Sequence, residues 1–261
     1  MSDELLTAYD ADLRGVAEVA SAPVWDTSGP LWRARFGDSG FVTYESLAGH
    51  DVEALVAETV AHFAGDPTVD SFEWKTRGHD DLPDLHAVLL AAGLVPDEPE
   101  TVMVGDASAL AEGPSAPDGV VIRRIDDLPD RVPLLAAATL MQREVFGRSG
   151  ELLELVEQGT GRTEVWVAQL DAGTQGRIVS CGRLEEVPDT AFAGLWGGAT
   201  VPEWRGRGLY RAMTAARACS ALGRGLRYLH SDCTPMSRPI LERSGLRAVT
   251  TTTPYLWRRA R

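Results

Sequence analysis

Residues 199–213 combine two closely spaced glycines with three arginines, a composition suited to binding an anion. The segment reads Ala-Thr-Val-Pro-Glu-Trp-Arg-Gly-Arg-Gly-Leu-Tyr-Arg-Ala-Met, and an apolar helical pattern starts at Leu209. Gly206 and Gly208 allow a tight turn before that helix. Because the first N–H groups of a helix attract negative charge, the segment predicts a cradle for a pyrophosphate group.

Two common phosphate-binding motifs do not fit this segment. A P-loop ends in Gly-Lys-Ser/Thr, whereas Gly208 is followed by Leu209 and Tyr210. The dinucleotide-binding fingerprint requires a third glycine where this chain has Arg211. The alternative is a solvated turn with two glycines and no ligand, and the glycines alone do not decide between the two.

The same segment resembles the acyl-coenzyme A loop of the GNAT acetyltransferase superfamily, whose pattern is Gln/Arg-x-x-Gly-x-Gly/Ala. The match holds at Arg205 and Gly208, whereas Tyr210 stands where Gly or Ala is usual. Three segments resemble the family's central strand, its last helix and its last strand: residues 199–204, 235–246 and 251–257. The resemblance covers roughly residues 119–259.

This resemblance implies the acyl-CoA N-acyltransferase fold, an α/β (α+β) fold with a mixed, mostly antiparallel sheet flanked by helices. It implies an N-acetyltransferase that uses acetyl-CoA as acyl donor and no metal, with direct attack by a primary amine in a ternary complex. The residues that it assigns to coenzyme A are Ala199, Thr200, Val201, Arg205, Gly206, Arg207, Gly208, Leu209, Tyr210, Arg211, Thr234 and Ser237.

An amine must lose a proton before it attacks, so the site needs a base, and four carboxylates are candidates. Glu203 follows the point at which the family's central strand leaves its neighbour, although it could equally compensate a helix dipole. Asp232 ends the next strand, where a helix cap is the favoured alternative. Glu185 and Glu186 are adjacent in a strand, so only one of them can face the cleft.

The chain departs from the family at the acid that protonates the leaving thiolate. Aligning on Gly245 places Leu241 at the family's tyrosine and Thr234 at its asparagine. Candidate substitutes are Tyr210, Ser237 and Tyr255. The departure also supports an alternative, a non-catalytic acyl-CoA sensor or partner-binding protein of the same fold.

The Gly-, Pro- and Ala-rich residues 111–118 predict a linker between two domains. Residues 119–261 form the predicted catalytic GNAT domain. Residues 1–110 are interpreted as a degenerate, tandem copy of the fold, because the order of helices and strands is similar at its end. Helices are expected there over residues 5–19, 52–63 and 82–94, with strands over 41–44, 69–74 and 100–104.

The composition is that of a globular protein. The 261 residues are 44% hydrophobic and 24% charged. No apolar run has the roughly 18 residues of a membrane span, and the acidic first residues are unlike a secretion signal. Three scattered cysteines are too few for a disulfide framework or a four-ligand zinc site. A cytoplasmic protein without a membrane partner is expected.

Charge is distributed unevenly along the chain. Residues 1–120 carry 23 acidic and five basic side chains, net −18, whereas residues 121–261 carry 15 and 20, net +5. The overall charge of −13 argues against nucleic acid as a partner, and an aminoacyl transferase fed by transfer RNA is least favoured. The acidic first half favours a cationic acceptor, either a small molecule or a peptide. The acceptor's identity and the oligomeric state stay open.

Overall fold

The structure is a computed structural model that describes residues 2–147, 150–159, 161–170 and 176–259. These residues form two compact units. The first unit comprises Met1–Val102, Asp232–Pro235 and Ala248–Arg261, and the second comprises Met103–Ser231 and Met236–Arg247. The last strand therefore packs in the first unit, although the chain order places it after the second. The predicted functional division at residues 111–118 stays a prediction.

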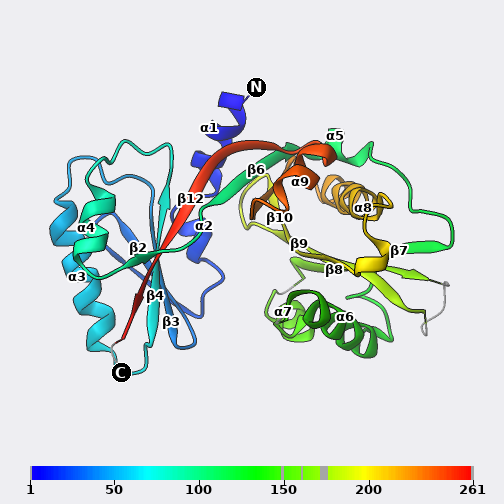
Figure 1. Cartoon of the computed structure of the whole chain (residues 1–261), viewed down its shortest axis with the longest axis horizontal. Coiled ribbons are helices and arrows are strands. Elements are labelled where there is room, and N and C mark those ends of the chain that lie inside the picture. The colour runs from blue at the N-terminus through cyan, green and yellow to red at the C-terminus, as the bar shows by residue number, and fades with distance from the viewer. Residues whose placement is uncertain (1, 148–149, 160, 171–175, 260–261) are drawn as a thin grey trace. The chain divides into compact units, whose positions relative to one another are not determined.

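Among the described residues, the first unit contains four helices and six strands (Figure 1). Its helices are α1 (Ser2–Asp12), α2 (Val16–Val19), α3 (Val52–Gly65) and α4 (Leu85–Ala91). Its strands are β1 (Val24–Ser28), β2 (Leu31–Phe36), β3 (Ser39–Tyr44), β4 (Ser71–Arg77), β5 (Val95–Pro96) and β12 (Arg247–Arg258). β6 (Glu100–Asp106) runs across the boundary between the units. The strand order is β1-β2-β3-β4-β12, with β5 beside β12, and only β3 and β4 pair in parallel.

Three elements of the first unit differ from the sequence-based expectation. The helix predicted over residues 5–19 is broken into α1 and α2 because Gly15 adopts a φ of 67°, outside the helical region. The β1–β2 hairpin was not predicted, because β1 is exposed on nearly every residue and lacks an apolar alternation. The sequence also predicts two strands over residues 249–257, whereas the structure has one continuous strand, β12, because no turn interrupts it.

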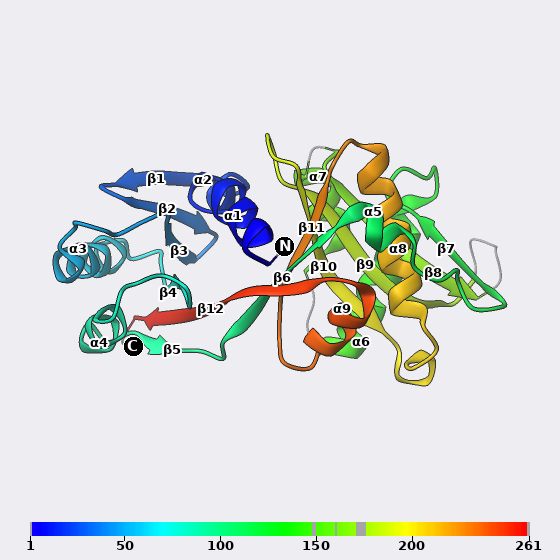
Figure 2. The ribbon, with the colours of Figure 1, turned by 90° about the horizontal axis from the view of Figure 1, so that it is seen from above.

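In the second unit, helices flank the strands (Figure 2). Its helices are α5 (Ala107–Ala111), α6 (Arg131–Phe146), α7 (Leu152–Gln158), the 3₁₀ turn η1 (Pro202–Trp204), α8 (Leu209–Gly223) and α9 (Arg238–Ser244). Its strands are β7 (Val120–Arg124), β8 (Thr163–Leu170), β9 (Ile178–Glu186), β10 (Phe192–Thr200) and β11 (Tyr228–Cys233). They lie in the order β11-β10-β9-β8-β7, and only β10 and β11 are parallel. The predicted fold class, a mixed and mostly antiparallel sheet with flanking helices, is confirmed.

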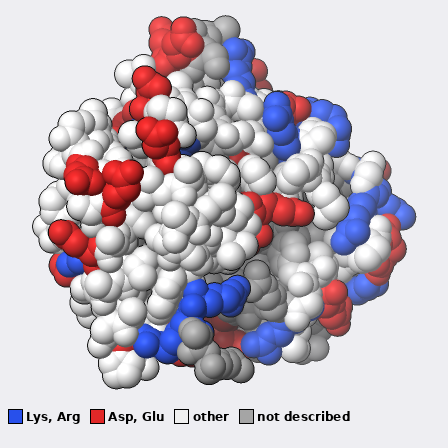
Figure 3. Space-filling view, turned by 60° about the vertical axis from the view of Figure 1, so that its left-hand side comes forward, with Lys and Arg blue, Asp and Glu red and all other residues white. Residues whose placement is uncertain are grey.

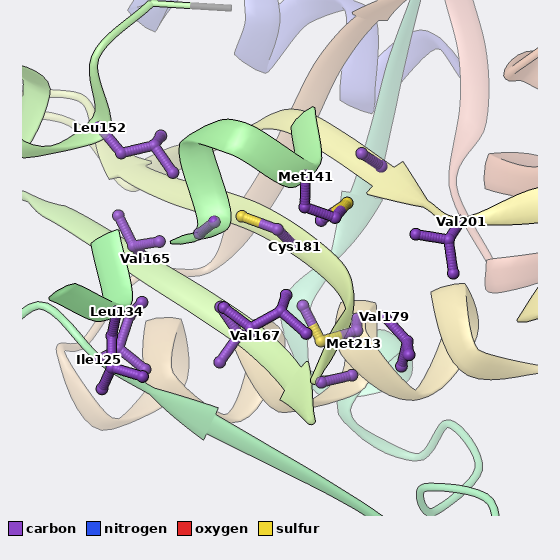
Figure 4. Packing of buried hydrophobic residues seen from close by; sticks show 14 of the residues in the cluster. Ile125, Leu134, Met141, Leu152, Val165, Val167, Val179, Cys181, Val201 and Met213 are labelled. Carbon is purple, nitrogen blue, oxygen red and sulfur yellow. The ribbon is translucent and has the colours of Figure 1, made fainter. Parts of the chain in front are cut away.

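The two faces of this sheet are occupied by different helices. Val165, Val167, Val179 and Cys181 form one buried cluster with residues of α6 such as Met141 (Figure 4). On alternate positions the strands face α8 instead, where the buried Glu164 accepts hydrogen bonds from Ser220 and Arg224. Because side chains alternate along a strand, the odd-numbered residues of β9 face α6 and the even-numbered ones face α8.

The two units share an order of elements. In the first, α3 connects the parallel strands β3 and β4, and in the second α8 connects the parallel strands β10 and β11. The helix that follows ends in the same way in both. Leu94 N–H donates to Leu89 C=O at 3.0 Å, and Leu246 N–H donates to Leu241 C=O at 3.1 Å. The preceding glycines, Gly93 and Gly245, both have positive φ.

The connecting helices differ in their first turn. Asp51 caps α3 and accepts a hydrogen bond from Ala54 N–H at 2.9 Å. Gly208 occupies the same place in α8, and within the described part of the chain no side chain caps that helix. A carboxylate at the start of α3 repels an anion, whereas the start of α8 is open to one.

We expect Asp51→Ala to lower the free energy of unfolding by about 1 kcal/mol, because the Ala54 N–H loses its acceptor. Chemical denaturation measures the change. Asp51→Ser is the control, since a serine hydroxyl can accept the same hydrogen bond. An equal loss in both variants would contradict the capping role.

Candidate functional site

β10 pairs with β11 over only part of its length. The parallel register joins Phe192, Ala193 and Gly194 to β11 residues Tyr228, Leu229 and His230, and ends there. β10 remains paired with β9 as far as Thr200, across an irregularity between Trp196 and Ala199. The two parallel strands therefore part after Gly194, and one edge of β10 no longer has a strand beside it.

Side chains from neighbouring elements supply donors to the carbonyl groups of this diverging segment. Ser231 Oγ donates to the Leu195 carbonyl at 3.0 Å, and Gln142 Nε2 donates to the Gly197 carbonyl at 2.6 Å. Ser180 Oγ donates to the Ala199 carbonyl at 2.7 Å, and Arg205 Nε donates to the Thr200 carbonyl at 3.0 Å.

The N–H groups of the same segment alternate in direction. Val201 N–H donates to the Val179 carbonyl on β9 at 3.0 Å. Successive residues of a strand direct their N–H groups to opposite edges, so Thr200 N–H points to the edge that β11 has left. This edge therefore presents Thr200 N–H as a donor to a ligand.

The turn after β10 has the geometry that its two glycines predict. Gly206 and Gly208 have φ values of 74° and 79°, and no atom lies within 4 Å of a Cβ added to either. Glycine is therefore needed here for backbone conformation and not for space. Both residues are exposed, and α8 begins directly after Gly208 with its apolar residue Leu209 buried.

The start of α8 has the features of an anion site. The first bond within the helix runs from Ala212 N–H to the Gly208 carbonyl at 3.1 Å, so helix geometry leaves the preceding N–H groups directed outward. Arg205, Arg207 and Arg211 are exposed around them. The Arg207 guanidinium lies 4.7 Å from the centre of the Trp204 ring, which orders it beside the turn.

Tyr210 lies flat against the backbone of β10. A Cβ added to Gly198 would lie 2.8 Å from Tyr210 Cε2 and 3.3 Å from its hydroxyl oxygen. The opposite strand has a glycine at the matching position, because Gly182 follows Cys181, the partner of Ala199. The Arg217 guanidinium occupies the space over Gly182, with Nη1 2.8 Å from an added Cβ. The two glycines thus make room for a tyrosine and an arginine side by side.

Arg217 is a functional candidate that the sequence does not reveal. In the structure it is buried, with 1% of its surface exposed. Its Nη1 donates to the Arg183 carbonyl at 3.0 Å and its Nε to the Met213 carbonyl at 3.2 Å. Burial lowers the pKa of Arg217, and a hydrogen bond to the Tyr210 side chain is among the contacts that oppose the shift. A buried cation beside the Tyr210 hydroxyl stabilises negative charge on that oxygen.

Comparison with solved structures identifies the architecture. A GCN5-related N-acetyltransferase from Kribbella flavida superposes with a TM-score of 0.72 at 15% identity, over 98% of this chain and 95% of that one. A tandem GNAT protein from the clavulanic acid biosynthesis pathway gives 0.67 at 15% identity, over 99% and 96%. A GCN5-related N-acetyltransferase from Sphaerobacter thermophilus gives 0.65 at 14% identity, over 88% and 76%. The chain has the GNAT fold. No family model and no curated protein sequence matches it.

Within this GNAT fold, the four candidate bases have different surroundings. Glu203 is exposed and forms an ion pair with Arg177. A hydrogen bond from its own backbone N–H and the contact with Arg177 hold the pKa of Glu203 below its usual value, which weakens it as a base. Glu186 pairs with Arg224, at 2.5 Å. Glu185 pairs instead with Arg183, at 2.6 Å.

The fourth candidate, Asp232, belongs to the first unit and is part of a buried ionic network. Its Oδ2 accepts a hydrogen bond at 2.8 Å from the Nζ of Lys75, the single lysine of the chain. Lys75 also contacts Glu18 at 3.1 Å, and Arg77 pairs with the same glutamate. Burial acts to raise the pKa of Glu18, but Lys75 and Arg77 outweigh it and hold that pKa below its usual value.

The remaining predicted residues fall at different places in the GNAT fold. Ser237 precedes α9, where its side chain forms no capping hydrogen bond, and Thr234 is exposed in the first unit. Tyr255 also lies in the first unit, where its hydroxyl is 2.5 Å from His86 Nδ1. Leu241, at the family's tyrosine position, is 1% exposed. Residues 199–211 and Ser237 thus share one unit, which Asp232, Thr234 and Tyr255 do not.

The described residues contain no cluster of His, Cys, Asp or Glu side chains able to hold a metal ion. Among the described helices, none has the length and apolarity to cross a membrane. Charged side chains are nonetheless grouped on the surface. On the face in Figure 3, one area carries mainly acidic side chains, whereas the basic side chains elsewhere lie among further acidic ones.

We expect Lys75→Met to lower the free energy of unfolding by about 3 kcal/mol at neutral pH, because Asp232 and Glu18 lose a buried cation. The difference in unfolding free energy between the variant and the wild type should shrink in acid. The pKa of Glu18 is lower in the folded than in the unfolded state, so its ionised form stabilises the fold at neutral pH. This stability is lost as the pH falls and Glu18 takes up a proton.

Denaturation at several pH values measures this effect. Arg33→Met is the comparison, since Asp26, the partner of Arg33, is 52% exposed, and a loss below about 1 kcal/mol is expected. Similar losses in the two variants would contradict the importance of the buried network.

Proposed function

We propose that the second unit is an N-acetyltransferase that moves an acetyl group from acetyl-CoA to a primary amine. Bound acetyl-CoA would supply the thioester, and the amine would attack it directly within a ternary complex. The amine nitrogen bonds to the acyl carbon, the carbon–sulfur bond breaks, and the thiolate leaves with the electron pair. The GNAT fold supports this class of reaction, and the residues of the site support its details.

The observation that carries the proposal is the parting of β10 from β11 directly before a glycine turn at a helix N-terminus. The turn provides N–H groups and arginines for a diphosphate, at Arg205, Gly206, Arg207, Gly208 and Arg211. The edge of β10 provides Thr200 N–H for the pantetheine arm and the thioester oxygen. Fixed donors aimed at a developing oxyanion contribute a few kcal/mol to catalysis.

Tyr210 is proposed as the acid that protonates the leaving thiolate. Its ring packs on the backbone of Gly198 within the diverging segment, and its hydroxyl contacts the buried Arg217 guanidinium. The cation stabilises the negative charge that remains on the Tyr210 oxygen after proton transfer. This role would replace the tyrosine that is missing at Leu241.

The first unit is proposed to be a degenerate copy of the same fold that has lost coenzyme A binding. Its helix α3 begins with the carboxylate of Asp51, which accepts a hydrogen bond from Ala54 N–H. That carboxylate takes the place at which the second unit offers free N–H groups. Residues 1–110 would then have a structural or substrate-positioning role beside the catalytic domain 119–261.

A second candidate function, a non-catalytic acyl-CoA sensor, is favoured by the buried Leu241. The two candidates are separated by measuring thiol release from acetyl-CoA in the presence of a panel of amines. Binding of acetyl-CoA without acetylation of any free or peptidic amine would support the sensor and contradict the transferase.

We expect Gly208→Ala to weaken coenzyme A binding about tenfold, because a φ of 79° is strained for alanine and the N–H groups lose their alignment. Calorimetric titration with coenzyme A measures the affinity. Gly225→Ala is a matched control, since Gly225 has the same φ of 79° and open space but lies beyond the other end of α8. Equal affinities of the two variants would contradict binding at the glycine turn.

We expect Tyr210→Phe to lower kcat for amine acetylation about tenfold or more while leaving coenzyme A affinity nearly unchanged, because only the proton donor is lost. Steady-state rates of thiol release measure this, together with calorimetry. Tyr255→Phe removes the hydroxyl that contacts His86 in the first unit. A loss of kcat in that variant, with none in Tyr210→Phe, would overturn the assignment.

A further inference from the structure

A row of residues crosses one face of the sheet where β10 and β11 part. Gly194 pairs with Glu185 on β9 and with His230 on β11, so the three residues lie side by side. Because Gly194 has no side chain, the Trp196 indole folds over it, and an added Cβ would lie 2.1 Å from Trp196 Nε1. The indole meets His230 edge to face, with 5.4 Å between ring centres.

Arg183 lies on the same face as this row. It pairs directly with Trp196 across the strands, and its Nε donates to Glu185 Oε1 at 2.6 Å. The other end of the guanidinium reaches the irregular part of β10. Arg183 Nη1 and Gln142 Nε2 each lie 2.8 Å from a Cβ added to Gly197. Two nitrogen donors from β9 and α6 therefore converge where β10 has left its neighbour.

The charged groups of this face suit a ligand that carries one positive and one negative charge. Among the described residues, Arg183 forms an ion pair with Glu185 alone, and that contact uses Nε. The two Nη groups remain for a planar anion, and a guanidinium fork matches a carboxylate in shape. Glu185 is 32% exposed and has a second carboxylate oxygen, suited to an ammonium group or its proton. The Trp196 ring forms a wall beside both.

We propose that this face, formed by Arg183, Glu185 and Trp196, binds the acceptor as an amine that also carries a carboxylate one or two carbons away. The inference rests on the proposed transferase function. Arg183 holds the carboxylate of the acceptor. Glu185 accepts the proton that the amine nitrogen gives up as it bonds to the acyl carbon. The acceptor class is thus that of amino acids.

This acceptor differs from the cationic one that the acidic first half of the chain favours. Net charge acts over the whole surface and guides encounter, whereas the groups within contact distance select the ligand. A polyamine or a lysine side chain has no group to pair with Arg183. An amino acid satisfies Arg183 and Glu185 together.

The test compares amino acids with the amines that lack only the carboxylate, such as phenylalanine with phenethylamine and tryptophan with tryptamine. Thiol release from acetyl-CoA gives kcat and KM for the wild type and for Arg183→Gln. We expect wild-type kcat/KM to favour the amino acid about tenfold or more. Arg183→Gln should raise KM for the amino acid about ten- to hundredfold more than KM for the decarboxylated amine. kcat should fall for both acceptors, because Arg183 also donates to Glu185. Equal preference of the wild type for both acceptors, or an equal rise of both KM values in the variant, would overturn the proposal.

Arg33→Gln is the control variant. Arg33 likewise lies on a strand, is 14% exposed and pairs through Nε with a carboxylate, that of Asp26, at 2.8 Å. It lies in the first unit, and neither KM should change. Glu185→Gln tests the proton acceptor: kcat should fall about tenfold or more, with KM for the amino acid less affected. An unchanged kcat would contradict the role of Glu185.

Direct binding separates this inference from the transferase proposal. Calorimetric titration of amino acids into the complex with coenzyme A requires no turnover. One outcome is that amino acids bind the wild type and not Arg183→Gln, while no amine is acetylated. This outcome would support the acceptor site and contradict the transferase proposal. Acetylation of decarboxylated amines alone would retain the transferase and reject the acceptor site.

Discussion

The organisation of the second unit depends on one constraint: β10 continues after its neighbour β11 has left. Buried peptide groups must find partners, and a strand that loses one neighbour exposes a row of them. Here side chains donate to carbonyl groups of the segment: Ser231 to Leu195, Gln142 to Gly197 and Arg205 to Thr200. Thr200 N–H points to the same edge and is a donor for a ligand. An edge of this kind favours a ligand rich in oxygen and resists pairing with another strand.

Glycines around this edge serve three different physical purposes. Gly206 and Gly208 provide positive φ for the turn, and a Cβ would have free space at both. Gly182 and Gly198 provide space instead, since side chains of α8 lie directly on their backbone. Gly194 makes room for the indole of its own strand. A substitution with alanine would therefore act through strain at the first pair, through displacement of Arg217 or Tyr210 at the second, and through Trp196 at the last.

The sequence predicts the turn and the fold class well because both depend on local patterns. Residues 199–209 reveal a strand end, a turn and a helix start within a few residues. The sequence does not reveal contacts between residues that are far apart along the chain. The pairing of Lys75 with Asp232 spans 157 positions, and β12 joins strands of the first unit after the chain has completed the second. In the sequence Arg217 resembles the other arginines of the helix, and only the structure shows that it packs on Gly182.

The comparison of the two units gives a physical reason why, in the proposed function, the second unit binds an anion and the first does not. Both units have a helix between parallel strands and a following helix that ends at Gly-Leu. They differ in the residue before the connecting helix. In the first unit the Asp51 carboxylate accepts a hydrogen bond from Ala54 N–H, one of the free donors, and stabilises α3. In the second, no side chain of the described residues caps the helix after Gly208, at a cost in helix stability that a bound diphosphate would offset. In the proposed function, coenzyme A binding would therefore be coupled to helix stability in α8 and independent of it in α3.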